Sequence, residues 1–284
     1  MLKKLPRVRL SNLPTPLYEA RNLSAILGGP QIFIKREDLT GLGMGGNKSR
    51  KLDFVMADAK QKGADVVISC AGAQSNWCLQ MAAAARRLGM EASFVLIGEP
   101  KPEPQGNLLL QNILNSKLKI LSGSIAGDTS YAFKAMEEVA DELRKKGRNP
   151  LIINPLDASS PYRALAVVGW VEAAEEIWQQ LQDFKVDASS LVLANGSGGT
   201  QAGLALGAKH MKLPFEVIGI SVFSNEAEAI ENVVTQANET ADLLGLDTLI
   251  TADEVKVYGE LISGTQNPSG APRNISFFLQ HFHA

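Results

Sequence analysis

Short apolar runs alternate with longer amphipathic segments along most of this 284-residue chain. In the first half, strand-like runs at 66–68 and 93–97 flank a helical pattern at 75–88, which ends at Gly89. A strand, a helix and a second strand in this order are typical of a parallel sheet whose faces are covered by helices. The alternation therefore predicts an α/β fold.

The remaining expected elements follow the same patterns. Further strands are expected at 32–34, 118–121, 151–153, 190–194 and 217–220, and further helices at 49–62, 107–115, 131–146, 161–181, 200–211 and 226–244. An isolated apolar run at 275–279 is one more strand candidate.

The length allows two lobes, because single domains commonly span roughly 100 to 200 residues. We expect a smaller α/β lobe at 45–149 and a larger lobe built from 1–44 and 150–284. Each lobe is expected to hold an open parallel sheet with helices on both faces.

The balance of charges argues against nucleic acid as a partner. With 28 basic and 30 acidic residues the net charge is -2, so no basic field is available to attract a phosphate backbone. No run approaches the ~18 apolar residues of a membrane helix, and no signal-peptide pattern is present. The sequence therefore predicts a cytoplasmic protein with a small-molecule ligand and no membrane partner.

The metal-ligating residue types are few. Cys70 and Cys78 lack the close spacing of zinc or redox motifs, and we expect both to be reduced. The three histidines, His210, His281 and His283, have no carboxylate or cysteine at ligand spacing. We therefore expect neither a metal site nor a histidine-based catalytic triad.

Lys48 follows two glycines at the start of the helix expected at 49–62. Glycines let the backbone approach a ligand closely, and the positive end of a helix disfavours a second cation, which should lower the pKa of this amine. An amine of this kind can form a Schiff base with a carbonyl compound. The alternative is that Lys48 belongs, with Arg50 and Lys51, to a solvated run of charges.

A second glycine-rich segment, Gly196-Ser197-Gly198-Gly199-Thr200, joins the strand expected at 190–194 to a helix. Its backbone N–H groups and the helix dipole could hold a phosphate, although a plain tight turn is the alternative. Gln201 stands where a dinucleotide-binding motif has its third glycine, and no acidic residue follows the next strand.

A third loop, Gln74-Ser75-Asn76, follows the strand expected at 66–68. Ser75 or Asn76 could be a simple helix N-cap. However, strand-to-helix loops of a parallel sheet lie at one edge, where ligands bind.

Taken together, these segments resemble a known enzyme family. The segments at 34–41 and 45–52, Gln74-Ser75-Asn76 and the run at 196–203 are similar to those of pyridoxal-phosphate enzymes with the tryptophan-synthase-β fold. Within that fold, Gly45-Gly46-Asn47-Lys48 and Gln74-Ser75-Asn76 resemble D-cysteine desulfhydrases and 1-aminocyclopropane-1-carboxylate (ACC) deaminases. The resemblance covers about residues 10–258.

The resemblance implies pyridoxal 5'-phosphate as cofactor and a role for each loop. Lys48 would hold the cofactor as a Schiff base, Asn76 would bond its ring hydroxyl, and Gly196, Ser197, Gly198, Gly199 and Thr200 would cradle its phosphate. Ser75 would contact the substrate carboxylate or transfer a proton. It also implies a homodimer that acts on a small amino acid.

Two departures from the family pattern bear on activity. Trp77-Cys78-Leu79 replaces a polar run that contains threonine and arginine, and the closing segment of the family is not recognisable after about Gly259. We therefore expect a truncated or replaced tail, and the residue facing the pyridine nitrogen stays unassigned.

The expected activity is elimination from D-cysteine to a 2-oxo acid, ammonia and sulfide. ACC deamination and a catalytically silent relative that binds the cofactor are the alternatives. A nucleotide-binding domain that uses the turn at 196–200 is a third possibility, disfavoured by the missing acidic residue.

Overall fold

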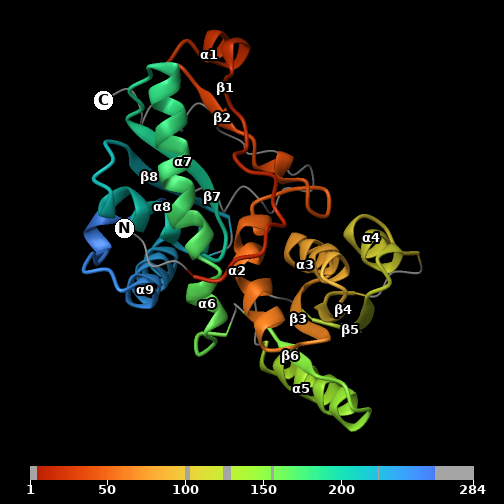
Figure 1. The fold of residues 1–284 in the computed structure, drawn as a ribbon. Coiled ribbons are helices and arrows are strands. Elements are labelled where there is room, and N and C mark those ends of the chain that lie inside the picture. The colour runs from red at the N-terminus through yellow and green to blue at the C-terminus, as the bar shows by residue number, and fades with distance from the viewer. Residues whose placement is uncertain (1–4, 100–102, 124–128, 155–156, 223, 260–284) are drawn as a thin grey trace. The chain divides into compact units, whose positions relative to one another are not determined.

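The computed structural model describes residues 5–99, 103–123, 129–154, 157–222 and 224–259 (Figure 1). It divides into two compact units. Unit 1 comprises Met1–Leu13 and Glu37–Gly169, and unit 2 comprises Pro14–Arg36 and Trp170–Ala284. The lobe boundaries expected from the sequence, at 44/45 and 149/150, stay a prediction.

Unit 1 is built on a four-stranded parallel sheet in the order β5-β4-β3-β6. Its strands are β3 (Val66–Gly72), β4 (Glu91–Ile97), β5 (Lys117–Leu121) and β6 (Pro150–Ile152). Its helices are α2 (Lys48–Gln61), α3 (Asn76–Arg87), α4 (Asn107–Ile113), α5 (Ser130–Lys145) and α6 (Tyr162–Leu165), with a short 3-10 turn, η1 (Glu37–Thr40).

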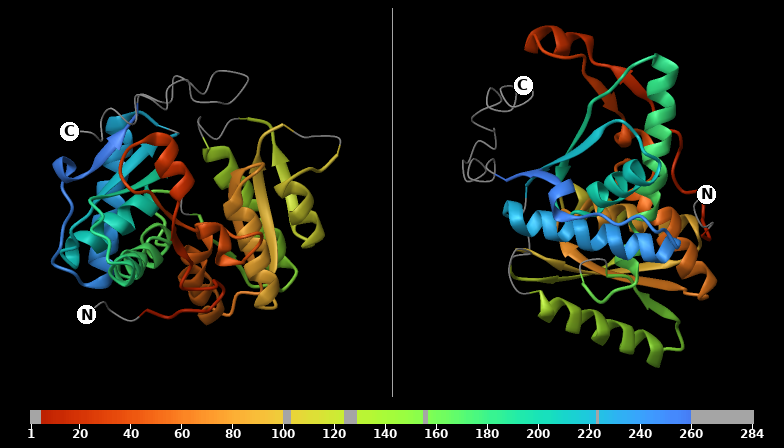
Figure 2. Two further views of the ribbon diagram at one scale, coloured as in Figure 1. Left: turned by 90° about the horizontal axis from the view of Figure 1, so that it is seen from above. Right: turned by 90° about the vertical axis from the view of Figure 1, so that its left-hand side faces the viewer.

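Helices cover both faces of this sheet because neighbouring strand residues point to opposite sides. Val66 and Ile68 of β3 pack with Met136 of α5, which runs along one side of the sheet in Figure 2. Val67 between them packs in the cluster formed by α2 and α3, with Val55. The sequences of the buried central strands are therefore continuously apolar, as expected of a parallel sheet.

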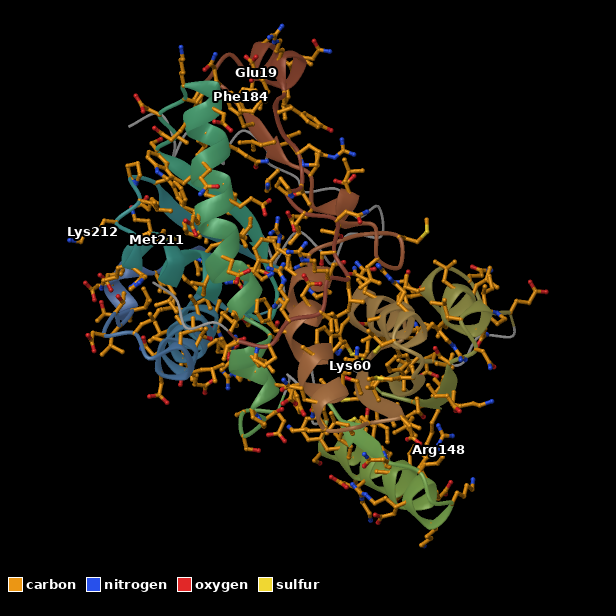
Figure 3. The ribbon with its side chains drawn as sticks, viewed as in Figure 1. Glu19, Lys60, Arg148, Phe184, Met211 and Lys212 are labelled. Carbon is orange, nitrogen blue, oxygen red and sulfur yellow. The ribbon has the colours of Figure 1, made fainter. Side chains whose placement is uncertain are left out.

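A charged cluster secures the edge of the sheet where β3 and β4 begin. Arg148, labelled in Figure 3, bonds Asp65 Oδ2 from Nε at 2.7 Å and Glu91 Oε1 from Nη1 at 3.0 Å. The functional loops follow the opposite, carboxyl ends of the strands.

Unit 2 contains two small sheets. β7 (Ser190–Asn195), β8 (Glu216–Ser221) and β9 (Lys256–Tyr258) form a parallel sheet, and β1 (Leu17–Glu19) pairs antiparallel with β2 (Phe33–Lys35). Its helices are α1 (Arg21–Leu27), α7 (Val168–Phe184, whose first two residues belong to unit 1), α8 (Gly199–His210) and α9 (Glu226–Leu244), with the 3-10 turn η2 (Ala252–Glu254).

The apolar core of unit 2 joins α7 and α8 to the sheet of β7 and β8. Trp170 and Ile177 of α7, Leu204 of α8 and Val217 of β8 are buried together. A half-buried ion pair, Lys35 Nζ to Glu176 Oε1 at 2.5 Å, connects β2 to α7. These contacts fix the strand β7, from which the glycine-rich segment departs.

The predicted α/β architecture is confirmed, with two corrections. The helix expected at 161–181 is broken into α6 and α7, and Gly169 lies so close to α2 that a Cβ there would be 2.4 Å from the Arg50 carbonyl oxygen. The strand expected at 32–34 pairs only with β1 and belongs to neither parallel sheet. The strand candidate at 275–279 lies outside the described residues.

Within the described part of the chain, no helix is both long and apolar enough to cross a membrane. The same part of the chain has no cluster of three or more histidine, cysteine or acidic side chains suited to a metal ion. Cys70 and Cys78 are buried and free.

Candidate active site

Lys48 is the first residue of α2 and follows a loop with an unusual backbone, here named the lysine loop (43–47). Four consecutive residues, Gly43, Met44, Gly45 and Gly46, have positive φ angles of 54°, 72°, 78° and 125°. A Cβ on Gly45 would lie 1.8 Å from the Asp38 carbonyl oxygen. Only glycine fits this close approach, which explains the glycines before the lysine.

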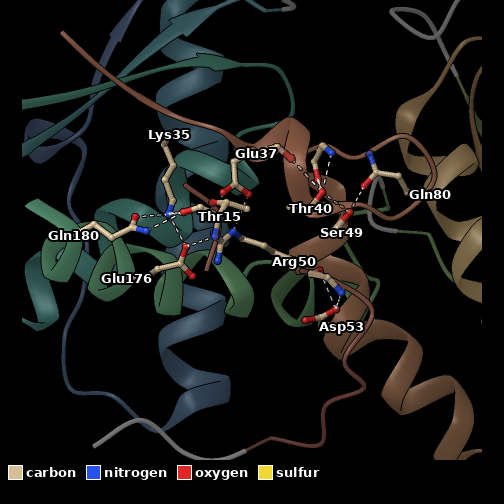
Figure 4. A network of polar contacts seen from close by, with 12 residues as sticks. Thr15, Lys35, Glu37, Thr40, Ser49, Arg50, Asp53, Gln80, Glu176 and Gln180 are labelled. Carbon is tan, nitrogen blue, oxygen red and sulfur yellow. Dashed lines mark hydrogen bonds and ion pairs between the residues drawn. The ribbon is translucent and has the colours of Figure 1, made fainter. Parts of the chain in front are cut away.

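A polar network holds the lysine loop against α3 (Figure 4). Gln80 Nε2 donates to the Gly45 carbonyl at 2.8 Å, and Gln80 Oε1 accepts from Ser49 Oγ at 2.8 Å. Thr40 Oγ1 accepts from the Gly46 amide at 2.9 Å and lies 3.0 Å from Ser49 Oγ. Because Gln80, Ser49 and Thr40 are buried, these bonds are shielded from water and fix the start of α2.

The Lys48 amine is perturbed in the direction that Schiff-base chemistry requires. Burial lowers the pKa of Lys48, and its Nζ donates to Asn47 Oδ1 at 3.1 Å. A lowered pKa increases the fraction of neutral, nucleophilic amine near pH 7. Burial is the cause of this lowered pKa, whereas the sequence had suggested the positive end of the helix as the cause.

The alternative in which Lys48, Arg50 and Lys51 form a solvated run of charges is wrong for Arg50 and Lys51, because both are buried. Arg50 is 1% exposed and bonds Glu37 with two nitrogens, each at 2.8 Å. Lys51 is 6% exposed, and burial together with the charge of Lys48 lowers its pKa well below the usual range. No hydrogen bond of Lys51 is found within the described residues.

Ser75 and Asn76 form the start of α3, directly after β3. Ser75 is the N-cap, because its Oγ accepts from the amides of Trp77 at 3.1 Å and Cys78 at 3.5 Å. The capping alternative is therefore confirmed for Ser75, whose side chain also hydrogen-bonds the Cys78 thiol. Asn76 is exposed and donates no hydrogen bond to the described part of the protein.

The segment from Gly196 to Thr200, here named the glycine loop, joins β7 to α8 in unit 2. Gly198 has a φ of 85°, and a Cβ there would lie 2.9 Å from Gln236 Nε2 and 3.3 Å from the Asn232 carbonyl carbon. Gln236 donates to the Ser197 carbonyl at 2.5 Å, which holds the loop on α9. The loop shape therefore depends on glycine at 198 and on a glutamine 38 residues away from it.

The start of α8 has the chemistry of an anion cradle. The N-cap residue of this helix, Gly198, makes no side-chain capping bond, and the helix dipole places partial positive charge at the helix start. Gln201 fills the place of a third glycine, and its amide bonds Asn195 of β7 and the Lys256 carbonyl of β9. A phosphate fits this donor set, whereas the acidic ribose partner of a dinucleotide site is absent at the end of β8, which is Ser221.

The structure places the predicted residues in two groups. Lys48, Ser75 and Asn76 belong to unit 1, where Gln80 links the lysine loop to the helix that Ser75 and Asn76 begin. Gly196, Ser197, Gly198, Gly199 and Thr200 belong to unit 2. Sequence reasoning missed Gln80 and Gln236, which hold the lysine loop and the glycine loop through hydrogen bonds from distant helices.

The lysine loop, the capped start of α3 and the start of α8 are the features expected of an enzyme of the pyridoxal-phosphate class. The chain belongs to the family described as "Pyridoxal-phosphate dependent enzyme", which matches residues 8–265. The predicted family and cofactor are thereby confirmed.

Individual relatives narrow the comparison. A protein of Pyrococcus furiosus, provisionally named ACC deaminase, is 38% identical over 258 residues, which are 91% of this chain and 75% of that protein. A D-cysteine desulfhydrase of Salmonella paratyphi B is 38% identical over 257 residues, covering 89% of this chain and 74% of the relative. The crystal structure of an ACC deaminase homologue is similar with a TM-score of 0.77 and 35% identity, over 95% of this chain and 82% of the other.

Proposed function

We propose that this enzyme is a lyase that eliminates from a small amino acid, with D-cysteine as the first candidate substrate. The products are pyruvate, ammonia and sulfide. The observation that carries the proposal is the Lys48 amine, whose pKa is lowered by burial, at the end of a loop in which Gly45 leaves no room for a side chain. The similarity to D-cysteine desulfhydrase supports the substrate class.

Each part of the candidate site has a proposed task. Pyridoxal phosphate, when bound, supplies an electron sink for the substrate carbon that loses a bond. Lys48 holds the cofactor covalently through Nζ and carries a proton there. Asn76 donates to the ring oxygen, and the glycine loop holds the phosphate.

Ser75 is proposed to act on the substrate through its hydroxyl group. Its Oγ accepts from the amides of Trp77 and Cys78, which holds the hydroxyl group at the start of the helix. This orientation suits a bond to the substrate carboxylate or transfer of a proton to the substrate.

ACC deamination is the second candidate, because the Pyrococcus relative with that name is as similar as the desulfhydrase. A panel of D-cysteine, L-cysteine and ACC separates the two. Sulfide with pyruvate supports the first candidate, and a four-carbon 2-oxo acid from ACC supports the second.

Binding and turnover need separate readouts, because a catalytically silent relative would also bind the cofactor. Addition of pyridoxal phosphate should produce a visible absorption band that Lys48→Ala abolishes and Lys51→Ala keeps. A band without product from any substrate would identify the silent relative. Affinity for NAD without any band would instead support the nucleotide-binding alternative.

We also propose that the enzyme is a homodimer in the cytoplasm, and the family resemblance supports this assembly. Light scattering should give twice the mass of one chain, and a monomer would contradict this assembly.

A further inference from the structure

Asn107, the first residue of α4, is bonded to the Gln74-Ser75-Asn76 loop through both its backbone and its side chain. Its backbone amide donates to Gln74 Oε1 at 2.8 Å. Its side-chain Nδ2 donates to the Gln74 carbonyl at 2.8 Å and to Asn76 Oδ1 at 2.8 Å. We name the side chains of Gln74, Asn107 and Asn76 the amide relay.

The amide relay has a defined direction, because it begins at backbone groups whose donor or acceptor character cannot change. The Gln74 carbonyl accepts only, so the Asn107 atom that faces it must be the NH2 group. That NH2 group also faces Asn76, so the Asn76 atom beside it must be the acceptor Oδ1. The NH2 group of Asn76 is therefore turned away from Asn107, with both hydrogens available.

The approach of α4 to this loop is built into the backbone. Gly106, just before Asn107, has a φ of +55°, and a Cβ there would lie 2.7 Å from Gln74 Oε1. Gln74 Nε2 also donates to the Gln105 carbonyl at 3.1 Å. A residue with a side chain at position 106 would displace Gln74, so the glycine is required for the relay.

The orientation of Asn76 matters if its partner is an ionised ring oxygen. An NH2 group donates to that oxygen and stabilises its anionic form, whereas a reversed amide would present lone pairs to a negative charge. The two orientations of the Asn76 side-chain amide therefore have opposite electrostatic effects on the ring oxygen.

We propose that Asn107 is a positioning residue that keeps the NH2 group of Asn76 directed at the cofactor ring oxygen. This proposal rests on the proposed function, in which Asn76 contacts that oxygen. Asn107 itself needs no contact with cofactor or substrate, since it acts through Asn76.

The substitution Asn107→Asp tests the direction of the relay, because a carboxylate only accepts hydrogen bonds. Asn76 should rotate to give its NH2 group to the new carboxylate and present Oδ1 to the ring oxygen. We expect the holoenzyme to bind pyridoxal phosphate about tenfold more weakly, and the pH midpoint of its visible band to rise by about one unit, since a charged hydrogen bond is lost. Asn112→Asp is the matched control, because Asn112 is exposed on the same helix and should leave both quantities at wild-type values.

A double-mutant cycle with Asn76→Ala separates positioning from a general structural effect. If Asn107 acts through Asn76, Asn107→Asp should shift the pH midpoint in the wild-type background and have little effect when Asn76 is already alanine. Asn107→Ala, which removes the donor without adding charge, should give a smaller shift in the same direction. Circular dichroism checks that each variant is folded.

The possible failures are distinguishable. If Asn76→Ala shifts the band but Asn107→Asp behaves like Asn112→Asp, the positioning role is overturned while the proposed function stands. A full Asn107→Asp shift in the Asn76→Ala background would also overturn it. Absence of a Lys48-dependent band in the wild-type protein would overturn the proposed function and this inference together.

Discussion

Replacing Gln80 by leucine should loosen the lysine loop, and the structure allows the cost to be worked out. Gln80 is 1% exposed and makes two hydrogen bonds of 2.8 Å, a buried one from Ser49 Oγ and a part-buried one to the Gly45 carbonyl. Each lost bond costs about 1 kcal/mol net. Ser49 keeps its contact with Thr40. We therefore expect the free energy of unfolding to fall by about 2 kcal/mol.

Gln111 provides a matched control for Gln80→Leu. It is fully buried, and neither polar atom of its side-chain amide has a hydrogen-bond partner in the described part of the chain. Gln111→Leu makes the same chemical change in unit 1 but removes no such bond, so it should be neutral or stabilising. Urea unfolding of both apo-variants, followed by circular dichroism, measures the difference. Equal unfolding free energies for the two variants would refute the assignment of stability to the Gln80 bonds.

Three further predictions concern Ser75, Glu254 and the cysteines. Ser75→Ala should cost about 1 kcal/mol of stability in urea unfolding through loss of the N-cap, and should lower kcat with the cofactor still bound; an unchanged kcat would contradict its catalytic role. Hydrogen bonds from Lys209 and from the Thr251 amide lower the pKa of Glu254 from 4.5 to about 2, so its stabilisation is complete above pH 4.5 and is lost as the pH falls through 2. Glu254→Gln should therefore unfold more easily than wild type at pH 7 but not at pH 2, and a difference that persists at pH 2 would contradict this. Burial raises the pKa of Cys70 to about 12 and also raises the pKa of Cys78, so iodoacetamide at pH 8 should modify neither in the folded protein; mass spectrometry that finds either one alkylated would contradict their burial.

The elements with strong periodicity could be predicted from the sequence. The helix expected at 226–244 matches α9 at both ends, and the one expected at 131–146 differs from α5 by a single residue at each end. The three-residue strands β1 and β9 were missed, because so short a segment carries too little alternation to be recognised. The break between α6 and α7 was missed because the sequence is continuously apolar from Ala164 to Val168 and gives no stop signal there.

Features of the candidate site that depend on local backbone geometry could be predicted from the sequence. Features that depend on contacts with residues distant in sequence could not. The glycines before Lys48 and the Ser75 N-cap follow from backbone geometry that a short segment reveals. The burial of Arg50 depends on Glu37, and the relay depends on Asn107, which is 31 residues from Asn76. Charges close together in sequence indicated solvation, but tertiary packing placed Arg50 and Lys51 inside the protein.

The central claim is that the amine of Lys48, and not that of Lys51 one turn later, carries the cofactor. Borohydride reduction of the pyridoxal-phosphate-treated protein, followed by peptide mapping with mass spectrometry, tests this directly. We predict that the reduced pyridoxyl phosphate group is found on Lys48 and that Lys51 is unmodified. A modified Lys51 with an unmodified Lys48, or no modified lysine at all, would contradict the account.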